Sequence, residues 1–144
     1  MTTLQYRVVY ADTDAGGVVY HGRYFEMAER SRMEAFSVLG VNILELQSRF
    51  QILLVVRQAQ AVFRRPAMLG DNLIFSSSVV GLTPARVKLK TVISRGIDDL
   101  CIVTVELACI KDFCKTTCLL PTELADLFST EDDAWSTTVN MVAS

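Results

Sequence analysis

Apolar residues recur at steps of three and four positions along residues 22–39, and this spacing predicts the one long helix of the chain. Glu, Arg and Met, which favour helices, are abundant there, and Gly40 occupies the position of a C-terminal helix cap. The recurring positions are the apolar Phe25, Ala28, Phe36 and Leu39, with Arg32 at the same spacing between them. We therefore expect a helix of about five turns that packs one face against the rest of the domain.

Strand patterns dominate the second half of the chain. Each strand segment is bounded by Pro, Gly, Asn or Asp residues typical of turns, and the last three are joined by short loops, which favours antiparallel pairing. The predicted strands cover residues 52–63, 72–82, 86–94 and 100–111, after a short first strand over residues 4–10. Residues 41–50 are ambiguous.

The end of the chain carries weaker signals. Residues 119–128 add a last short element, for which Thr122 after Pro121 suggests one or two helical turns. Residues 129–144 are acidic and then rich in Ser and Thr, so we expect a frayed tail after a single domain over residues 1–128. The predicted fold class is α+β, with one long helix against an antiparallel sheet of about five strands.

Composition narrows the functional classes. Hydrophobic residues make up 51% of the 144, more than a small monomer needs, which predicts a homo-oligomer. The net charge of −2 argues against a nucleic-acid partner, and no apolar run approaches the roughly 20 residues that span a bilayer. The first residues show neither a basic start nor an apolar segment, so we expect a cytoplasmic protein. Four cysteines without a CxxC pair and one histidine predict reduced thiols and no metal site.

The loop between the first strand and the long helix concentrates the candidate chemistry. It runs from Tyr10 to Gly22 and holds an acidic pair, a Gly-Gly turn and the only histidine, His21. A carboxylate, the unpaired N–H groups of a helix N-terminus and a proton carrier suit attack on an activated carbonyl group. From the residues alone, an Asp beside Gly-Gly is more often a turn former than a catalytic group, and a lone His before a helix is more often a cap or a satisfied polar residue.

The run Asp12-Thr-Asp14-Ala-Gly-Gly-Val-Val-Tyr-His21, followed by Gly-Arg-Tyr24-Phe and Glu29-Arg30, resembles the hotdog-fold acyl-CoA thioesterases of the 4-hydroxybenzoyl-CoA thioesterase superfamily. Within that group the chain is most similar to the YbgC type, which is associated with the bacterial Tol-Pal system. The similarity extends to Phe63-Arg-Arg-Pro-Ala-Met-Leu-Gly-Asp71 and to Leu119-Leu-Pro121, and so covers residues 4–128.

The resemblance implies a hotdog fold, in which the sheet wraps the long helix and two chains join their sheets edge to edge. It implies active sites at the subunit interface and dimers that pair into homotetramers. Asp14 matches the catalytic carboxylate, His21 and Tyr10 match supporting site residues, and Asp12 is expected to brace the loop. Backbone N–H groups at the helix start would receive the negative charge of the carbonyl oxygen, with candidates Tyr20, His21 and Gly22.

Basic residues offer places for the phosphates of coenzyme A. Arg64 and Arg65 flank the Pro-Ala turn. Arg86, Lys88 and Lys90 alternate with uncharged residues, so their side chains share one face of a strand. A solvated sheet face is the plainer interpretation of any one of them, whereas as a group they suit an anionic tail.

The predicted function is therefore hydrolysis of an acyl-CoA thioester to a free acid and coenzyme A, with Asp14 as general base or nucleophile. Coenzyme A would arrive as part of the substrate, and no separate cofactor or metal is expected. An acyl-carrier protein is an alternative carrier. Two alternative functions are a hydroxyacyl-thioester dehydratase of the same fold and a non-catalytic module that binds acyl thioesters.

Overall fold

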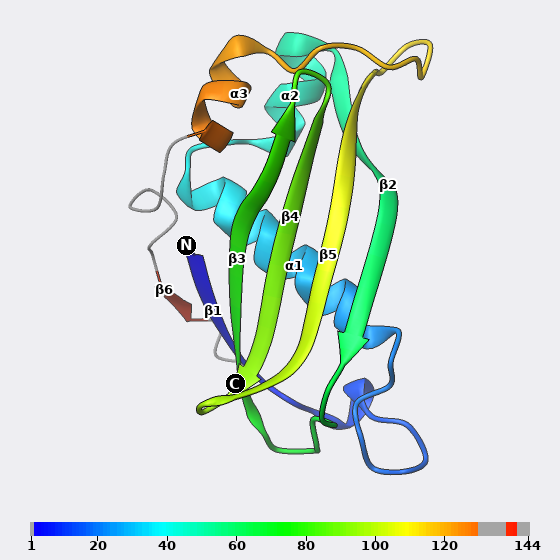
Figure 1. Ribbon diagram of the computed structural model, residues 1–144, viewed down its shortest axis with the longest axis vertical. Helices are drawn as coiled ribbons and strands as arrows, with labels where there is room; N and C mark the ends of the chain where they lie inside the picture. The colour runs from blue at the N-terminus through cyan, green and yellow to red at the C-terminus, as the bar shows by residue number, and fades with distance from the viewer. Residues whose placement is uncertain (1, 130–137, 141–144) are drawn as a thin grey trace.

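A curved sheet that wraps one long helix organises the computed structural model, which describes residues 2–129 and 138–140 (Figure 1). The elements are β1 (Thr2–Arg7), a 3-10 turn (Tyr10–Asp12), α1 (Arg23–Val38), α2 (Ile43–Phe50), β2 (Ile52–Phe63), β3 (Asn72–Thr83), β4 (Arg86–Arg95), β5 (Asp98–Lys111), α3 (Thr122–Ser129) and β6 (Thr138–Asn140). The predicted long helix and the four later strands are confirmed within two residues at each end.

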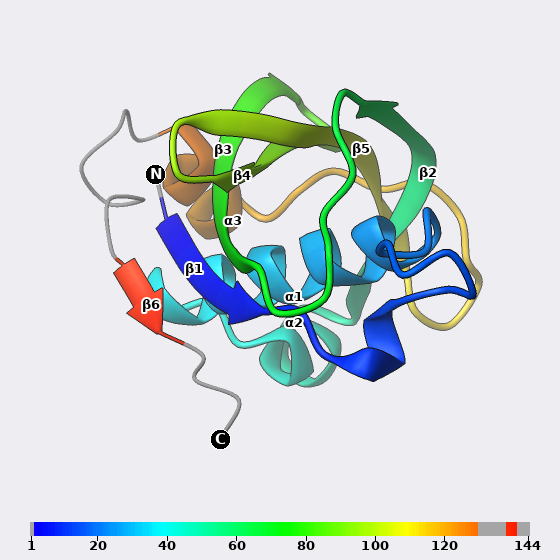
Figure 2. The same cartoon turned by 90° about the horizontal axis from the view of Figure 1, so that it is seen from below.

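The sheet has the strand order β2-β5-β4-β3-β1-β6, in which every pair is antiparallel except β1 with β6. The prediction of about five strands thus missed β6, which lies in the segment expected to fray and pairs in parallel with β1. Figure 2 shows the strands arching over α1, which lies inside the curve. This is the hotdog arrangement that the sequence resemblance implied.

The core fills the space between α1 and the concave face of the sheet. The apolar side chains that face α1, among them Leu73, Phe75, Leu89, Ile93 and Val103, are at most 1% exposed. One polar chain crosses this core, because Ser31 Oγ of α1 lies 2.9 Å from Ser77 Oγ of β3, which lies 2.8 Å from Thr91 Oγ1 of β4. These hydroxyl groups satisfy one another and fix α1 against the sheet.

Two elements differ from the sequence predictions. The first strand ends at Arg7 rather than residue 10, because the Asp12 carboxylate accepts a hydrogen bond from the Val9 N–H and closes a 3-10 turn. The ambiguous residues 41–50 contain α2, whose N-terminus is capped by the Asn42 side chain accepting from Leu44 N–H. Both α2 and α3 lie at the end of the sheet away from the loop before α1 (Figure 1).

Candidate active site

A tight hairpin presents Asp14 to solvent. Thr13 and Val19 form an antiparallel bridge, Asp14 N–H donates to Val18 O at 2.9 Å, and Gly17 N–H donates to Asp14 O at 3.1 Å. Gly17 has φ +78°, a conformation that residues with side chains rarely adopt. The Gly-Gly pair of the sequence therefore makes the turn that holds Asp14 at its corner.

One oxygen of the Asp14 carboxylate is held and the other is free. Oδ1 accepts a hydrogen bond from Gly16 N–H at 2.8 Å, and a Cβ atom at Gly16 would lie 3.2 Å from it. Oδ2 has no hydrogen-bond partner or ion pair within the part of the chain that the structure describes. This exposed oxygen is available to accept a proton or to attack a carbon atom.

Asp12 is the buried partner of the acidic pair. Its side chain is 1% exposed and accepts hydrogen bonds from Tyr6 Oη at 2.9 Å, from Val9 N–H at 2.9 Å and from the Arg23 guanidinium at 3.2 Å. Burial, and next the hydrogen bond to this carboxylate, raises the pKa of Tyr6. Asp12 thus ties β1, the loop and the first residue of α1 together, which confirms the predicted bracing role.

The helix end beside this loop carries unpaired N–H groups. Helix α1 begins at Arg23, and its N-cap, Gly22, makes no side-chain capping bond. The N–H groups of His21 and Gly22 donate to no group among the residues described. Tyr20 N–H, by contrast, donates to Asp12 O at 2.9 Å and is therefore engaged within the loop in this structure. Of the three predicted oxyanion donors, His21 and Gly22 thus keep free N–H groups within the described part of the chain.

The side chain of Tyr20 lies close to Gly22. Gly22 has an ordinary helical φ of −67°, but a Cβ atom there would lie 2.8 Å from Cε1 of the Tyr20 ring. The ring of Tyr20 also lies against that of His21, with centroids 4.4 Å apart. The backbone at position 22 therefore admits any residue, and a side chain there would have to displace the exposed Tyr20 ring.

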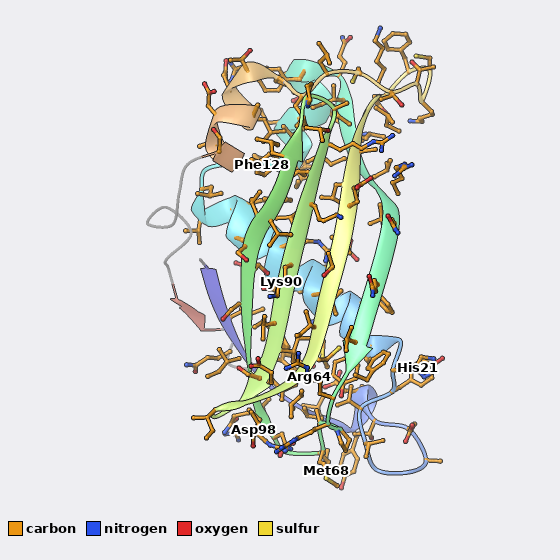
Figure 3. All side chains as sticks on the ribbon, viewed as in Figure 1. His21, Arg64, Met68, Lys90, Asp98 and Phe128 are labelled. Atoms are coloured by element: carbon orange, nitrogen blue, oxygen red, sulfur yellow. The ribbon has the colours of Figure 1, made fainter. Side chains whose placement is uncertain are left out.

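An open cavity of about 310 Å³ adjoins the helix end. It is lined by Val19, His21, Tyr24, Phe63, Arg64, Arg65 and Pro66. Figure 3 places His21 and Arg64 at the lower end of the molecule, near the loop. The cavity combines aromatic walls with two guanidinium groups. The structure thus brings three of the predicted site residues together, namely His21, Arg64 and Arg65.

The turn between β2 and β3 forms the opposite wall of the cavity and docks onto the loop. Val19 N–H donates to Ala67 O at 2.9 Å, and Ala67 N–H donates to Tyr24 Oη at 3.1 Å. Asp71 holds the turn itself, because its Oδ2 accepts from Met68 N–H and from Arg95 Nη1. Tyr24 belongs to the sequence motif shared with the family, and its contact across the fold with Ala67 reveals a role in holding the turn against α1.

Other predicted site residues lie apart from this cavity. The Tyr10 side chain is 81% exposed and does not line the cavity. Arg86, Lys88 and Lys90 share the outer face of β4, as their alternation predicts, but Figure 3 shows Lys90 well along the sheet from the loop. Within one chain, the predicted cationic rim therefore reduces to Arg64 and Arg65.

The two cavity arginines differ in how they are engaged. Arg65 Nη1 lies 3.3 Å from Asp98 Oδ1, whereas Arg64 makes no ion pair within the described ranges. On β4, Arg86 Nη1 lies 3.5 Å from Glu106 Oε1. Arg64 is thus the cation most available to an anionic ligand of the cavity.

The chain matches known proteins over most of its length. The model of the thioesterase-like superfamily matches residues 8–128. The acyl-CoA thioesterase YbgC of Haemophilus influenzae is 35% identical over 104 residues, which are 72% of this chain and 76% of that protein. The 1,4-dihydroxy-2-naphthoyl-CoA hydrolase of Thermosynechococcus vestitus is 29% identical over 108 residues, 74% of each chain.

Solved structures agree in fold. A probable thioesterase from Bartonella henselae is 35% identical, superposes with a TM-score of 0.77, and shares 83% of this chain and 98% of its own. The family match over residues 8–128 spans the loop that carries Asp14, α1 and strands β2 to β5. Among the described residues, no helix is both long and apolar enough to cross a membrane.

Proposed function

The chain belongs to the thioesterase-like superfamily and is a thioester hydrolase, and from this premise we propose that it hydrolyses acyl-CoA with Asp14 as the catalytic carboxylate. The observation that carries the proposal is that one short loop holds both a free carboxylate oxygen, on Asp14, and two N–H groups without a partner among the described residues, on His21 and Gly22. The carboxylate oxygen can activate the attacking water, and the N–H groups can bind the thioester carbonyl oxygen as it gains negative charge.

In the general-base form of the reaction, Asp14 Oδ2 takes a proton from water while the water oxygen attacks the thioester carbon. The carbonyl oxygen gains negative charge and is bound by the N–H groups of His21 and Gly22, each such donor contributing about 3 kcal/mol. The tetrahedral centre then expels the coenzyme A thiolate, which receives a proton. In the nucleophilic form, Asp14 attacks the carbon itself and the C–S bond breaks to release the coenzyme A thiolate, after which water hydrolyses the resulting anhydride and restores the Asp14 carboxylate.

The cavity beside the helix end suits part of the substrate. Arg64 and Arg65 offer guanidinium groups to phosphate oxygens, and Phe63 and Tyr24 offer an apolar wall. The His21 ring faces the same cavity, where it can orient water or meet the leaving thiolate. The supporting role of Tyr10, and any role of the β4 basic residues, require a second chain to bring them to the site.

A second copy of the chain is the partner that we propose for β2. This strand lies at one edge of the sheet, so one side of its backbone is unpaired, and it exposes Val56, Val62 and Phe63 to 55%, 45% and 51%. Pairing of β2 with its copy would satisfy the unpaired backbone N–H and C=O groups of this strand and bring a second subunit beside the cavity.

Sedimentation of the wild type and of Ala59→Glu tests this pairing, because the substitution adds a carboxylate to the middle of the exposed edge strand of each copy. A wild-type monomer would contradict it. Tetramer formation, the acyl-carrier protein and a cytoplasmic location stay predictions.

The activity test compares Asp14→Asn with Asp99→Asn, which removes the same charge from an exposed site. Free coenzyme A released from a panel of aliphatic and aromatic acyl-CoA thioesters is measured by mass, because the exposed Cys114 would react with thiol reagents. We expect Asp14→Asn to lose about 10² to 10⁴ of kcat and Asp99→Asn to keep it. Near-normal turnover in Asp14→Asn would contradict the assignment, and acyl-CoA binding without any release would indicate a binding module.

Single turnover in oxygen-18 water separates the two roles of Asp14. Label in the Asp14 carboxylate requires a covalent anhydride, whereas label in the product acid alone indicates direct attack by water. Mass spectrometry of the peptide that contains Asp14 reads this outcome.

A further inference from the structure

Two of the four cysteines lie in contact at the end of the sheet opposite the catalytic loop. Cys109 of β5 is 0% exposed, and its Sγ atom lies 3.4 Å from Sγ of the half-buried Cys118. The pair is held by backbone as well, because Cys118 N–H donates to Cys109 O at 3.0 Å. Both thiols are free in the structure.

The register of the chain places these residues directly opposite each other. After β5 the chain turns back, with Lys111 N–H donating to Thr116 O and an antiparallel bridge joining Ile110 to Thr117. The two sulfur atoms are already in contact at 3.4 Å, so formation of an S–S bond of about 2 Å requires them to approach by only about 1.4 Å.

The other two cysteines do not share this geometry. Cys101 stands eight residues before Cys109 on the same extended strand, which corresponds to roughly 26 Å. Cys114 lies at the exposed tip of the turn, where its Sγ contacts the Thr116 hydroxyl at 2.9 Å. A bond between Cys109 and Cys118 is thus the one that the fold has already aligned.

We propose that Cys109 and Cys118 are a redox modification site, which a small-molecule disulfide such as glutathione disulfide converts to an intramolecular disulfide. The half-buried Cys118 is the entry point. Its thiolate attacks one sulfur of the small disulfide, forms a mixed disulfide and releases one small thiol. The Cys109 sulfur then attacks the Cys118 sulfur and expels the second small thiol, so two protein thiols are oxidised and one small disulfide is reduced to two thiols.

The order of these two steps follows from the surroundings of each sulfur. Burial, and next the hydrogen bond from Cys118, raises the pKa of Cys109 to about 12, so Cys109 is a poor first nucleophile. In the second step the contact between Cys109 and Cys118 compensates for this raised pKa, because the attack is intramolecular and the two sulfur atoms are already adjacent. Cys101, whose pKa burial raises to about 11, has no thiol within reach.

The bond would close a loop of ten residues between the end of β5 and the segment that leads into α3. Closing a loop lowers the entropy of the unfolded chain, so the oxidised protein should unfold at higher urea concentration. The loop that carries Asp14 lies at the other end of the sheet, so turnover should not change (Figure 1).

The test treats the native protein with glutathione disulfide, blocks remaining thiols with an alkylating reagent and digests with trypsin. Cleavage after Lys111 and Lys115 separates three peptides, which contain Cys101 with Cys109, Cys114 alone, and Cys118. The expected product links the first peptide to the third, and it persists in Cys101→Ser and Cys114→Ser. It should be lost in Cys118→Ser and in Cys109→Ser.

Several outcomes would overturn the proposal. One is glutathione held on Cys118 with no linked peptide after long incubation, and another is a link that requires Cys101 or Cys114. A third is a linked protein with a urea midpoint no higher than that of the reduced form. Because mass and unfolding are measured without substrate, failure here is distinguishable from failure of the proposed thioesterase activity.

Discussion

Replacing Asp12 with Asn tests whether this buried carboxylate holds the catalytic loop. Oδ1 accepts from the Arg23 guanidinium and Oδ2 from the Val9 N–H, while Tyr6 Oη reaches both. The Asn side chain keeps only one oxygen, so its NH₂ group must face either the Arg23 guanidinium or the Val9 N–H. Both of these are hydrogen-bond donors, so the NH₂ group would face a donor and that hydrogen bond would be lost. Hydrogen bonds to a charged group contribute about 1.5–3 kcal/mol each, so we expect a loss of about 3 kcal/mol.

Urea unfolding measures this loss. With a slope of about 2 kcal/mol per molar urea, the midpoint should fall by about 1.5 M. Asp14→Asn is the matched control, because its exposed carboxylate makes one hydrogen bond and its loss should cost less than about 1 kcal/mol. Tyr6→Phe combined with Asp12→Asn should cost less than the sum of the two single changes. A fall of less than about 0.5 M in Asp12→Asn would refute the bracing role.

Three further predictions concern the core and the helix start. Ser77→Ala removes the two side-chain hydrogen bonds that Ser77 makes to Ser31 of α1 and Thr91 of β4, and should lower the free energy of unfolding in urea by about 2 kcal/mol. Ser78→Ala, on the half-buried outer face, should change it little. Burial raises the pKa of Cys101 to about 11 from 9.0, so the stability it contributes is complete below pH 9 and lost as the pH rises to 11. Unfolding of Cys101→Ala should therefore depend less steeply on pH over that interval. Gly22→Ala should displace the Tyr20 ring and lower kcat. Tyr20→Ala in the same chain removes the clash and should restore part of kcat, and an absence of recovery would contradict the clash as the cause.

Much of the fold could be predicted because its elements have strong local patterns. The long helix and the strands show clear periods, and the turns between them carry Gly, Pro or Asp. The eight residues of α2 were ambiguous because so short an amphipathic segment fits several structures, although Asn42 as an N-cap was a usable signal. Strand β6 could not be predicted, since its pairing depends on β1, at the other end of the chain.

The site was predictable where chemistry is local and not where it depends on distant contacts. The Asp14 turn and the free N–H groups of His21 and Gly22 follow from the order of residues in one loop. That Tyr20 N–H is occupied by Asp12 O depends on how the loop folds back on itself. The direction of β4, which carries Lys90 away from the cavity, is likewise set by the whole sheet.

The two outer edges of the sheet are unequal in the part of the chain that the structure describes. On one side β6 pairs with β1 over three residue pairs, whereas β2 presents twelve residues on the other. Chains with two long open edges could add copies without end and form filaments. A chain with a single long edge can use it once, against its own copy, and growth through the sheet then stops at two.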